Sequence, residues 1–190
     1  MKIFRNDFFR PRFPLLVSIV AAALLNGCAS VPYSTPLTRH LDNRIEKYPE
    51  DIDLIVDRAF AYAMLGESEA AVRDFEMARK IDPDSYHLLR SEGWAYLNLG
   101  WNRRALEAWE KAFSGDRRDY WNSNHTLAIG HWVNGNRQKA LELYDRAAEF
   151  VPEEFATREN LEDFTRFWTW KEKEIVFPLF DAWSRGYAVE

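Results

Sequence analysis

Apolar residues recur every three to four positions through the middle of the chain, which is the period of an amphipathic helix. The pattern divides this region into three pairs of stretches, with a glycine between the two members of each pair. Gly66, Gly100 and Gly135 suit the left-handed backbone conformation that commonly ends a helix. We therefore predict an all-α structure built from three helix–turn–helix pairs. The predicted helices cover residues 52–65 and 68–81, 86–99 and 102–114, and 121–133 and 137–150.

The three pairs repeat with a period of 34 residues, in units that cover 52–85, 86–119 and, after the inserted residue Tyr120, 121–154. Every unit has Ala or Gly at three equivalent positions and an aromatic residue beside them. Small side chains let two helix backbones approach closely, and the aromatic ring fills the space next to them. The small residues are Ala59, Gly93 and Ala128; Ala71, Ala105 and Ala140; and Ala78, Ala112 and Ala147, and the aromatic residues are Phe75, Trp109 and Tyr144.

A helical pair of 34 residues with these small positions resembles the tetratricopeptide repeat. The resemblance implies a right-handed superhelical solenoid of three repeats, in which the first helix of each repeat lines a concave groove. The sequence departs from the family pattern at the seventh position, where Arg58 and Glu92 replace the usual Leu. It departs again at Arg117, which replaces the Pro that ends a repeat, so we expect a looser junction at 115–120.

Helical patterns also flank the repeats. Residues 37–50 resemble the second helix of a truncated repeat and should cap the first full unit. Residues 155–190 predict carboxy-terminal capping helices over 157–168 and 170–185. The sequence Thr169-Trp170-Lys171-Glu172 fits a capping box that would begin the second of these helices. Pro178 should kink that helix, and Gly186 should end it.

The carboxy-terminal segment is unusually aromatic. One interpretation is a hydrophobic plug over the last repeat, and the other is a surface for a partner or for a second copy of the chain. The sequence leaves both interpretations open. The aromatic residues are Phe155, Phe164, Phe167, Trp168, Trp170, Phe177, Phe180, Trp183 and Tyr187.

The amino terminus has the pattern of a secretory signal: a basic start, an apolar run over 14–25, and a small-residue exit. Twelve helical residues span about 18 Å, which is too short to cross a bilayer. The sequence Leu25-Asn26-Gly27-Cys28 resembles the lipobox of bacterial lipoproteins. The resemblance implies removal of residues 1–27, a diacylglyceryl and an N-acyl lipid on Cys28, and a lipidated tether over 28–36. Because residue 29 is Ala rather than Asp, it also implies an outer-membrane anchor facing the periplasm.

Charge and composition narrow the functions further. The formal net charge is −5, and removal of residues 1–27 leaves 21 basic and 29 acidic residues, a net charge of −8. Such a chain has no basic surface for nucleic acid. The single cysteine allows no internal disulfide, and His125 and His131 lie on different faces of one helix. We therefore expect no metal, no catalytic residue, no enzyme activity and no cofactor beyond the lipid on Cys28.

The groove is the remaining candidate site. The family positions that face it combine apolar and aromatic side chains with an Arg, two His and several amides. We expect Trp94 to anchor a protein or peptide partner and Arg90 to bind a carboxylate. The alternative is that the apolar residues Phe60, Met64, Trp94 and Ile129 pack against neighbouring helices or against the carboxy-terminal segment. The candidate groove residues are Asp53, Val56, Phe60, Met64, His87, Arg90, Trp94, Asn98, Asn122, His125, Ile129 and Val133.

These features together predict a lipid-anchored, non-catalytic protein-binding scaffold or adaptor in the cell envelope. Related lipoproteins with this repeat serve envelope assembly or the regulation of envelope enzymes. The alternative is an immunity lipoprotein that neutralises a periplasmic toxin. The sequence also leaves open a homo-oligomer, in which the partner is a second copy of the chain.

Overall fold

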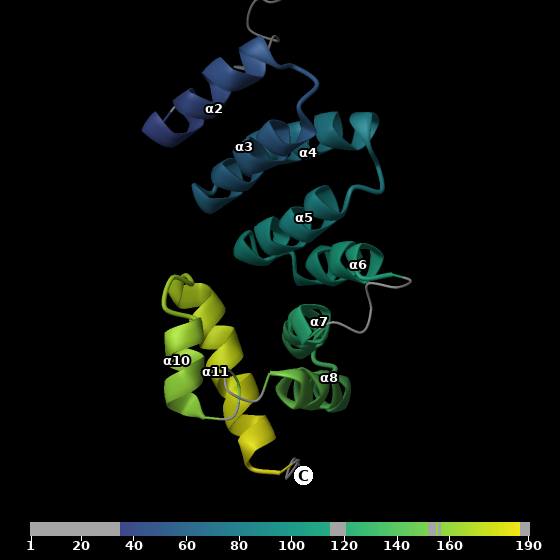
Figure 1. Cartoon of the computed structure of the whole chain (residues 1–190), viewed down its shortest axis with the longest axis vertical. Coiled ribbons are helices and arrows are strands. Elements are labelled where there is room, and N and C mark those ends of the chain that lie inside the picture. Colours follow the sequence, from purple (N-terminus) through teal and green to yellow (C-terminus); the bar gives the residue numbers. More distant parts are fainter. Residues whose placement is uncertain (1–34, 115–120, 152–154, 156, 187–190) are drawn as a thin grey trace, which may run out of the picture. The chain divides into compact units, whose positions relative to one another are not determined.

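The computed structural model describes residues 35–114, 121–151, 155 and 157–186, all within one unit that covers residues 34–190. The regular elements in this part of the chain are helices, and Figure 1 shows the repeats stacked as successive pairs. None of the helices described is long and apolar enough to cross a membrane. The signal sequence, the lipidation site and the looser junction predicted above lie outside the described residues. The helices are α2 (Pro36–Lys47), α3 (Ile52–Met64), α4 (Ser68–Ile81), α5 (Tyr86–Asn98), α6 (Asn102–Ala112), α7 (Trp121–Val133), α8 (Arg137–Phe150), α10 (Arg158–Phe164) and α11 (Trp170–Ser184).

The three helix pairs close with the same turn. Gly66, Gly100 and Gly135 have φ angles of 78°, 80° and 82°, so the predicted left-handed conformation is confirmed. In each turn the residue after the glycine donates its backbone N–H to the carbonyl five residues earlier, as Trp101 does to Tyr96 at 2.8 Å. The shared turn gives the repeats one backbone geometry, and their helices end within about two residues of the predicted bounds.

The nine small positions are all buried, and the three aromatic rings beside them are 0% exposed. The second repeat shows why small residues are needed there. A Cβ on Gly93 would overlap the indole of Trp109, which packs directly against the α5 backbone. The indole Nε1 donates to the carbonyl of Arg90, one turn earlier in α5, at 3.3 Å. The packing predicted from the repeat pattern is therefore confirmed.

Arg58 and Glu92, the two polar residues at the seventh position, form ion pairs between helices. Arg58 donates to Asp74 of α4 through Nε and Nη2, at 2.7 and 2.9 Å, and to Asp42 of α2 through Nη1, at 2.9 Å. Burial lowers the pKa of Arg58, but the bonds and charges of both carboxylates outweigh burial and raise the pKa overall. Glu92 accepts a hydrogen bond from Arg79 of α4. These departures from the repeat pattern therefore join neighbouring helices.

The amino-terminal cap covers the first repeat as predicted. Leu41 and Ile45 of α2 are each 7% exposed and belong to the core that α2 shares with α3 and α4. The helix begins at Pro36, one residue earlier than predicted, because the Thr35 side chain accepts from the backbone N–H of Thr38 and caps it.

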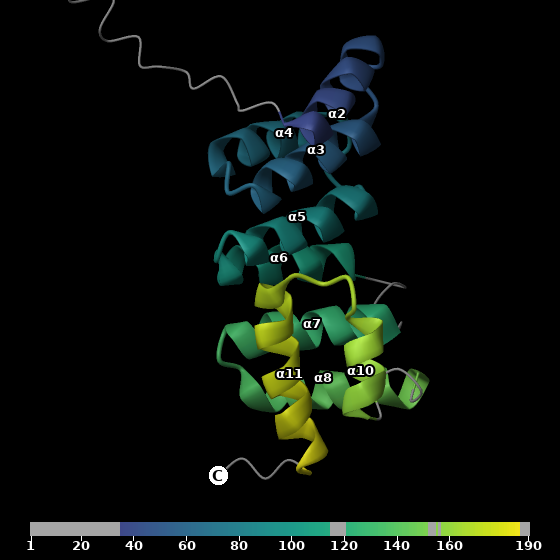
Figure 2. The same cartoon turned by 90° about the vertical axis from the view of Figure 1, so that its left-hand side faces the viewer.

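The carboxy-terminal cap lies against the third repeat, and Figure 2 shows α10 and α11 in front of α7 and α8. The predicted capping box is present, since the Thr169 N–H donates to Glu172 Oε2 at 2.7 Å and the Glu172 N–H donates to Thr169 Oγ1 at 3.2 Å. Gly186 has a φ of 72° after the end of α11, also as predicted. The helix continues through Pro178 without ending there.

The first helix of this cap is shorter than predicted. We expected it to reach residue 168, but α10 ends at Phe164. The buried Thr165 hydroxyl donates to the carbonyl of Leu161 at 2.7 Å, and the chain turns there. In the turn between α10 and α11, residues 165–169, the ring of Trp168 packs on Trp94 of the second repeat, and this contact forms part of the site described next.

Candidate functional site

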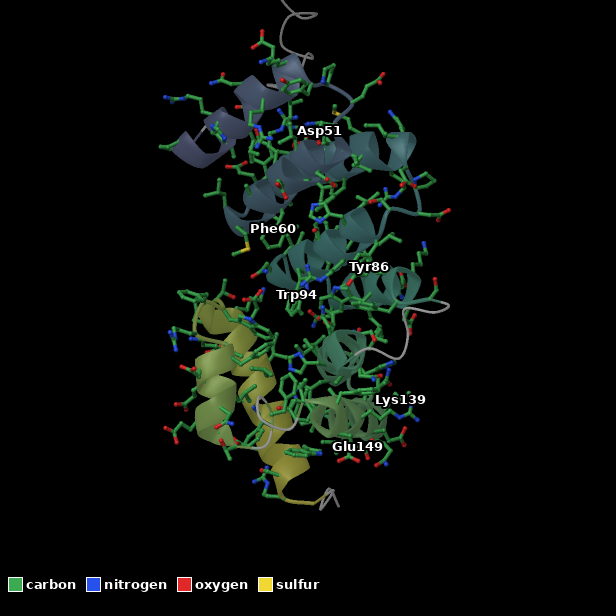
Figure 3. The ribbon with its side chains drawn as sticks, in the orientation of Figure 1. Asp51, Phe60, Tyr86, Trp94, Lys139 and Glu149 are labelled. Carbon is green, nitrogen blue, oxygen red and sulfur yellow. The ribbon has the colours of Figure 1, made fainter. Side chains whose placement is uncertain are left out.

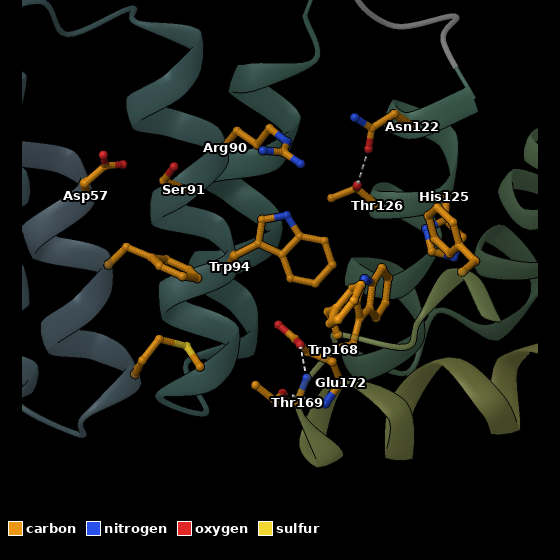
Figure 4. Close-up of a pocket in the computed structure, with 14 residues that line it drawn as sticks. Asp57, Arg90, Ser91, Trp94, Asn122, His125, Thr126, Trp168, Thr169 and Glu172 are labelled. Atoms are coloured by element: carbon orange, nitrogen blue, oxygen red, sulfur yellow. Dashed lines mark hydrogen bonds between the residues drawn. The ribbon is translucent and has the colours of Figure 1, made fainter. Parts of the chain in front are cut away.

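A pocket of about 560 Å³ opens on the inner side of the repeats, between helices α3, α5 and α7 and the α10–α11 turn. Figure 3 shows Phe60 and Trp94 on the side of α3 and α5 where this turn lies, and Figure 4 shows the pocket at close range. The walls combine aromatic rings, one arginine and several short polar side chains. The lining residues are Asp57, Phe60, Met64, Arg90, Ser91, Trp94, Asn122, His125, Thr126, Phe164, Phe167, Trp168, Thr169 and Glu172.

A chain of aromatic contacts holds the turn in place. The ring of Trp168 lies edge-on to that of Trp94, with centroids 5.4 Å apart. Trp94 in turn lies edge-on to the buried Trp109, with centroids 5.0 Å apart. Trp168 also contacts His125 of α7, with ring centroids 5.7 Å apart. The turn is therefore docked on both the second and the third repeat.

Polar bonds fix the start of α11 against the end of α5. Lys171 Nζ donates to the carbonyl of Asn98 at 2.7 Å, and the Asn98 amide donates to Glu172 Oε1 at 3.4 Å. Glu172 also completes the capping box of α11. These bonds and the aromatic chain together position one wall of the pocket.

His125 is a structural residue at the base of this wall. It is 2% exposed and stacks on Phe155, with ring centroids 4.7 Å apart and planes inclined by 25°. Tyr144 and Phe164 also contact the imidazole ring. Its Nε2 is buried and has no hydrogen-bond partner among the described residues. Burial lowers the pKa of His125 to about 3, so the ring is neutral near pH 7.

Arg90 is the cation of the pocket. Figure 4 shows its guanidinium above the Trp94 indole and across the pocket from Asn122. Its Nε is buried and has no hydrogen-bond partner in the described structure. The two acidic residues of the lining have other partners, since Asp57 Oδ1 lies 3.4 Å from His87 Nε2 and Glu172 is bonded as above.

The pocket shows no arrangement typical of a catalytic site in the residues described. Ser91 and His125 both line it, but no hydrogen bond joins the Ser91 hydroxyl to a histidine. No group of three or more His, Cys, Asp and Glu side chains that could hold a metal ion occurs in the described part of the chain. What the geometry offers is a concave surface with apolar walls and a single cation.

The structure brings half of the predicted groove residues together. Two others lie beside the pocket: Asn98 binds Glu172, and His87 pairs with the pocket residue Asp57. Asp53 is exposed in the first turn of α3, and Val133 is half-buried against the larger core. Their roles in binding remain predictions. The predicted residues that line the pocket are Phe60, Met64, Arg90, Trp94, Asn122 and His125.

The prediction that Val56 and Ile129 face an open groove is wrong. Val56 is 0% exposed and Ile129 is 1% exposed, and each belongs to a hydrophobic core. The family positions assume an open inner face, whereas α2 packs against α3 and α11 packs against α7. These two side chains are therefore not available to a partner.

The remaining lining residues are not among the predicted groove residues, although Phe164, Phe167 and Trp168 belong to the aromatic segment that was a candidate partner surface. Asp57, Ser91 and Thr126 are next to predicted groove residues in the sequence, on the same three helices. The others come from the carboxy-terminal cap, and the aromatic run near Trp168 was the signal for them. The cap residues of the lining are Phe164, Phe167, Trp168, Thr169 and Glu172.

The aromatic cap confirms the plug that was one of the two interpretations, and the partner surface stays a prediction. Phe155 and Phe180 are 0% and 6% exposed and plug the third repeat. Phe167 and Trp170, at the α10–α11 turn, are 92% and 72% exposed. Phe167 also lines the pocket. Tyr187 lies outside the described residues.

The repeated turn, the buried small residues and the capped inner face define a solenoid of the tetratricopeptide type. Among solved structures, the chain is similar to MamA 41-end from Desulfovibrio magneticus RS-1, with a TM-score of 0.55 and 18% identity over 80% of this chain and 86% of that one. It is also similar to the MamA RS-1 ArsTM double mutant, with a TM-score of 0.54 and 19% identity over the same shares. A further crystal structure of MamA has a TM-score of 0.53 and 15% identity, over 80% of this chain and 88% of that one.

At these identities the likeness shows the fold alone. No family model matches the chain. No curated protein matches it either.

Proposed function

We propose that this protein is a non-catalytic scaffold that binds a protein or peptide partner in the pocket between α3, α5, α7 and the α10–α11 turn. The observation that carries the proposal is the exposure of two apolar residues that line the pocket, since Met64 is 41% exposed and Phe167 is 92% exposed. Apolar side chains so exposed beside a concave site are typical of surfaces that a partner covers. A solenoid of helical repeats presents such a surface on rigid helices.

The second part of the proposal is the location. The single cysteine, Cys28, directly follows an apolar run, and the sequence around it resembles a lipobox. We infer that the mature chain is held by lipid at the outer membrane and faces the periplasm. Six residues lie between Cys28 and Thr35, the cap of α2, and the seven Cα–Cα steps that join these two residues extend at most about 25 Å. The pocket would then receive partners of the envelope, in assembly or in the control of envelope enzymes.

The experiment compares two methionines with equal exposure. Met64 lines the pocket, whereas Met77 of α4 does not, and each is 41% exposed. A photo-crosslinking amino acid replaces one or the other in the full chain, expressed in its native cell, and crosslinked products are separated and identified. We expect a discrete envelope protein to be crosslinked from position 64 and not from position 77.

Equal crosslinking from both positions, or none from position 64, would overturn the proposal. The identity of the product then separates the two envelope roles. An endogenous envelope protein supports the adaptor, and a toxin captured only after it is supplied from outside supports the immunity protein.

A further inference from the structure

Arg90 differs from the other half-buried arginines of the described chain. Three arginines in the described residues are neither exposed nor fully buried: Arg58, Arg79 and Arg90. Arg58 and Arg79 bind carboxylates of neighbouring helices. Arg90 has no carboxylate partner in the part of the chain that the structure describes, although its Nε is buried. A guanidinium with a nitrogen withdrawn from water is normally paired, so this one favours an anion supplied from outside the chain.

Further hydrogen-bond donors line the same pocket as the guanidinium. Thr126 Oγ1 donates to Asn122 Oδ1 at 3.4 Å, which leaves the Asn122 amide nitrogen without a partner among the described residues. Ser91, next to Arg90 in α5, contributes a hydroxyl to the same lining. An anion at Arg90 would thus receive charge-assisted bonds from the guanidinium, and a ligand that also reaches Ser91 or Asn122 would gain a neutral bond.

The charge of the other walls limits what that anion can be. Asp57 and Glu172 line the same pocket, and they would repel a doubly charged phosphate more strongly than a singly charged carboxylate. Apolar side chains line the same pocket, among them Phe60, Met64 and Phe167. The complementary ligand therefore carries one carboxylate close to an apolar side chain.

We propose that the pocket selects a peptide segment in which an Asp or Glu side chain pairs with Arg90 while a neighbouring aromatic or aliphatic side chain packs between α3 and the α10–α11 turn. This inference rests on the proposed function, because it specifies the partner of the same pocket. Arg90 fixes the register of the segment, and the aromatic wall supplies contact area.

The experiment begins with a random twelve-residue peptide library displayed on phage and selected against the full chain in detergent. The selected sequence is made as a fluorescent peptide, together with a version in which its acidic residue is changed to the amide and one in which it is phosphoserine. Binding is measured by fluorescence anisotropy to the wild type, to Arg90→Gln and Arg90→Lys, and to the control Arg73→Gln. Arg73 is exposed on α4 and gives the same change of charge.

We expect the selected peptides to carry an acidic residue within two positions of an apolar one. The amide peptide should bind the wild type at least tenfold more weakly, and so should the phosphoserine peptide. The affinity of Arg90→Gln for the acidic peptide should be lower than that of the wild type by the same factor. Its affinity for the amide peptide should be no lower than that of the wild type. Arg73→Gln should change neither affinity. Arg90→Lys should restore part of the affinity, because the charge remains but the planar fork is lost.

Two results separate the inference from the proposed function. If peptides are selected that compete for the pocket but lose nothing on amidation, the carboxylate inference fails and the scaffold stands. If no peptide is selected and position 64 gives no crosslink, the scaffold itself fails. The carbonyl of Arg90, not its side chain, accepts from Trp109, so Arg90→Gln leaves that internal bond intact. Circular dichroism then verifies that each variant is folded.

Discussion

The indole of Trp168 lies edge-on to that of Trp94, with centroids 5.4 Å apart and planes inclined by 70°. The two residues are far apart in the sequence, one in α5 of the second repeat and the other in the α10–α11 turn. Their contact joins the carboxy-terminal cap to the repeats and builds the pocket wall in the same step. The cap is therefore part of the site as well as the end of the solenoid.

Trp168→Ala should detach this wall. Trp168 contacts Trp94, His125 and Phe164, so truncation removes several ring contacts. Because the side chain is half-buried, we expect the free energy of unfolding to fall by about 2–3 kcal/mol, below the range for a fully buried Trp. Urea unfolding followed by circular dichroism measures the change.

Trp170→Ala is the matched control, since Trp170 is 72% exposed and its removal should alter stability by no more than about 0.5 kcal/mol. Equal losses in the two variants would contradict the docked turn.

Gly93→Ala tests the packing between the helices of the second repeat. In the interior of a helix this change normally stabilises by about 1 kcal/mol. Here the new Cβ would overlap the indole of Trp109, which is fully buried and cannot move aside freely. We expect the opposite sign, a loss of about 1–3 kcal/mol in the free energy of unfolding.

Thermal unfolding of Gly93→Ala should show a lower Tm than the wild type. Trp109→Phe in the same background provides the smaller ring that would make room for the Cβ. If the double variant is not more stable than the sum of the two single changes predicts, the clash is not the cause.

Cys28→Ser tests the proposed anchor. If the thiol of Cys28 carries the lipid, the variant should not be labelled by a fatty-acid probe, and the precursor should remain uncleaved because cleavage follows lipidation. Labelling of cells followed by gel electrophoresis of the immunoprecipitated protein measures both effects. A variant that is still processed and remains with the outer membrane would show that something other than Cys28 holds the chain there.

The repeat geometry could be predicted from sequence because its causes lie close together in the chain. A glycine ends each first helix, and small residues at fixed spacing decide how the pair packs, as Gly93 and Trp109 show. Each repeat therefore carries most of the information for its own structure.

The site was harder to predict because it depends on contacts between distant segments. Nothing near Trp94 in the sequence specifies that Trp168 will pack on it. The same docking buries His125, which the repeat pattern places in an open groove. The two alternatives for Trp94 both hold, because its ring packs on Trp109 and also lines the pocket. A Trp94→Ala variant should thus lose stability together with partner binding.

Acid should destabilise the junction between the third repeat and the cap through His125. Burial lowers its pKa in the folded protein to about 3, against about 6.5 in an unfolded chain. Above pH 6.5 the ring is neutral in both states and its contribution to stability is constant. Below pH 6.5 the unfolded state gains a proton that the folded state does not, so stability falls by about 1.4 kcal/mol per pH unit until the pH approaches 3.

At pH 5 this contribution amounts to about 2 kcal/mol relative to pH 7.5. Urea unfolding at both pH values measures it, in the wild type and in His125→Leu, because subtraction of the two removes the effect of every other titrating group. His131, whose pKa burial also lowers, remains in both proteins and cancels. We expect the variant to lose about 2 kcal/mol less than the wild type on acidification, and the exposed-site control His40→Gln to behave like the wild type. The same acid-induced loss in His125→Leu and in the wild type would mean that His125 reaches water and accepts a proton in the folded protein.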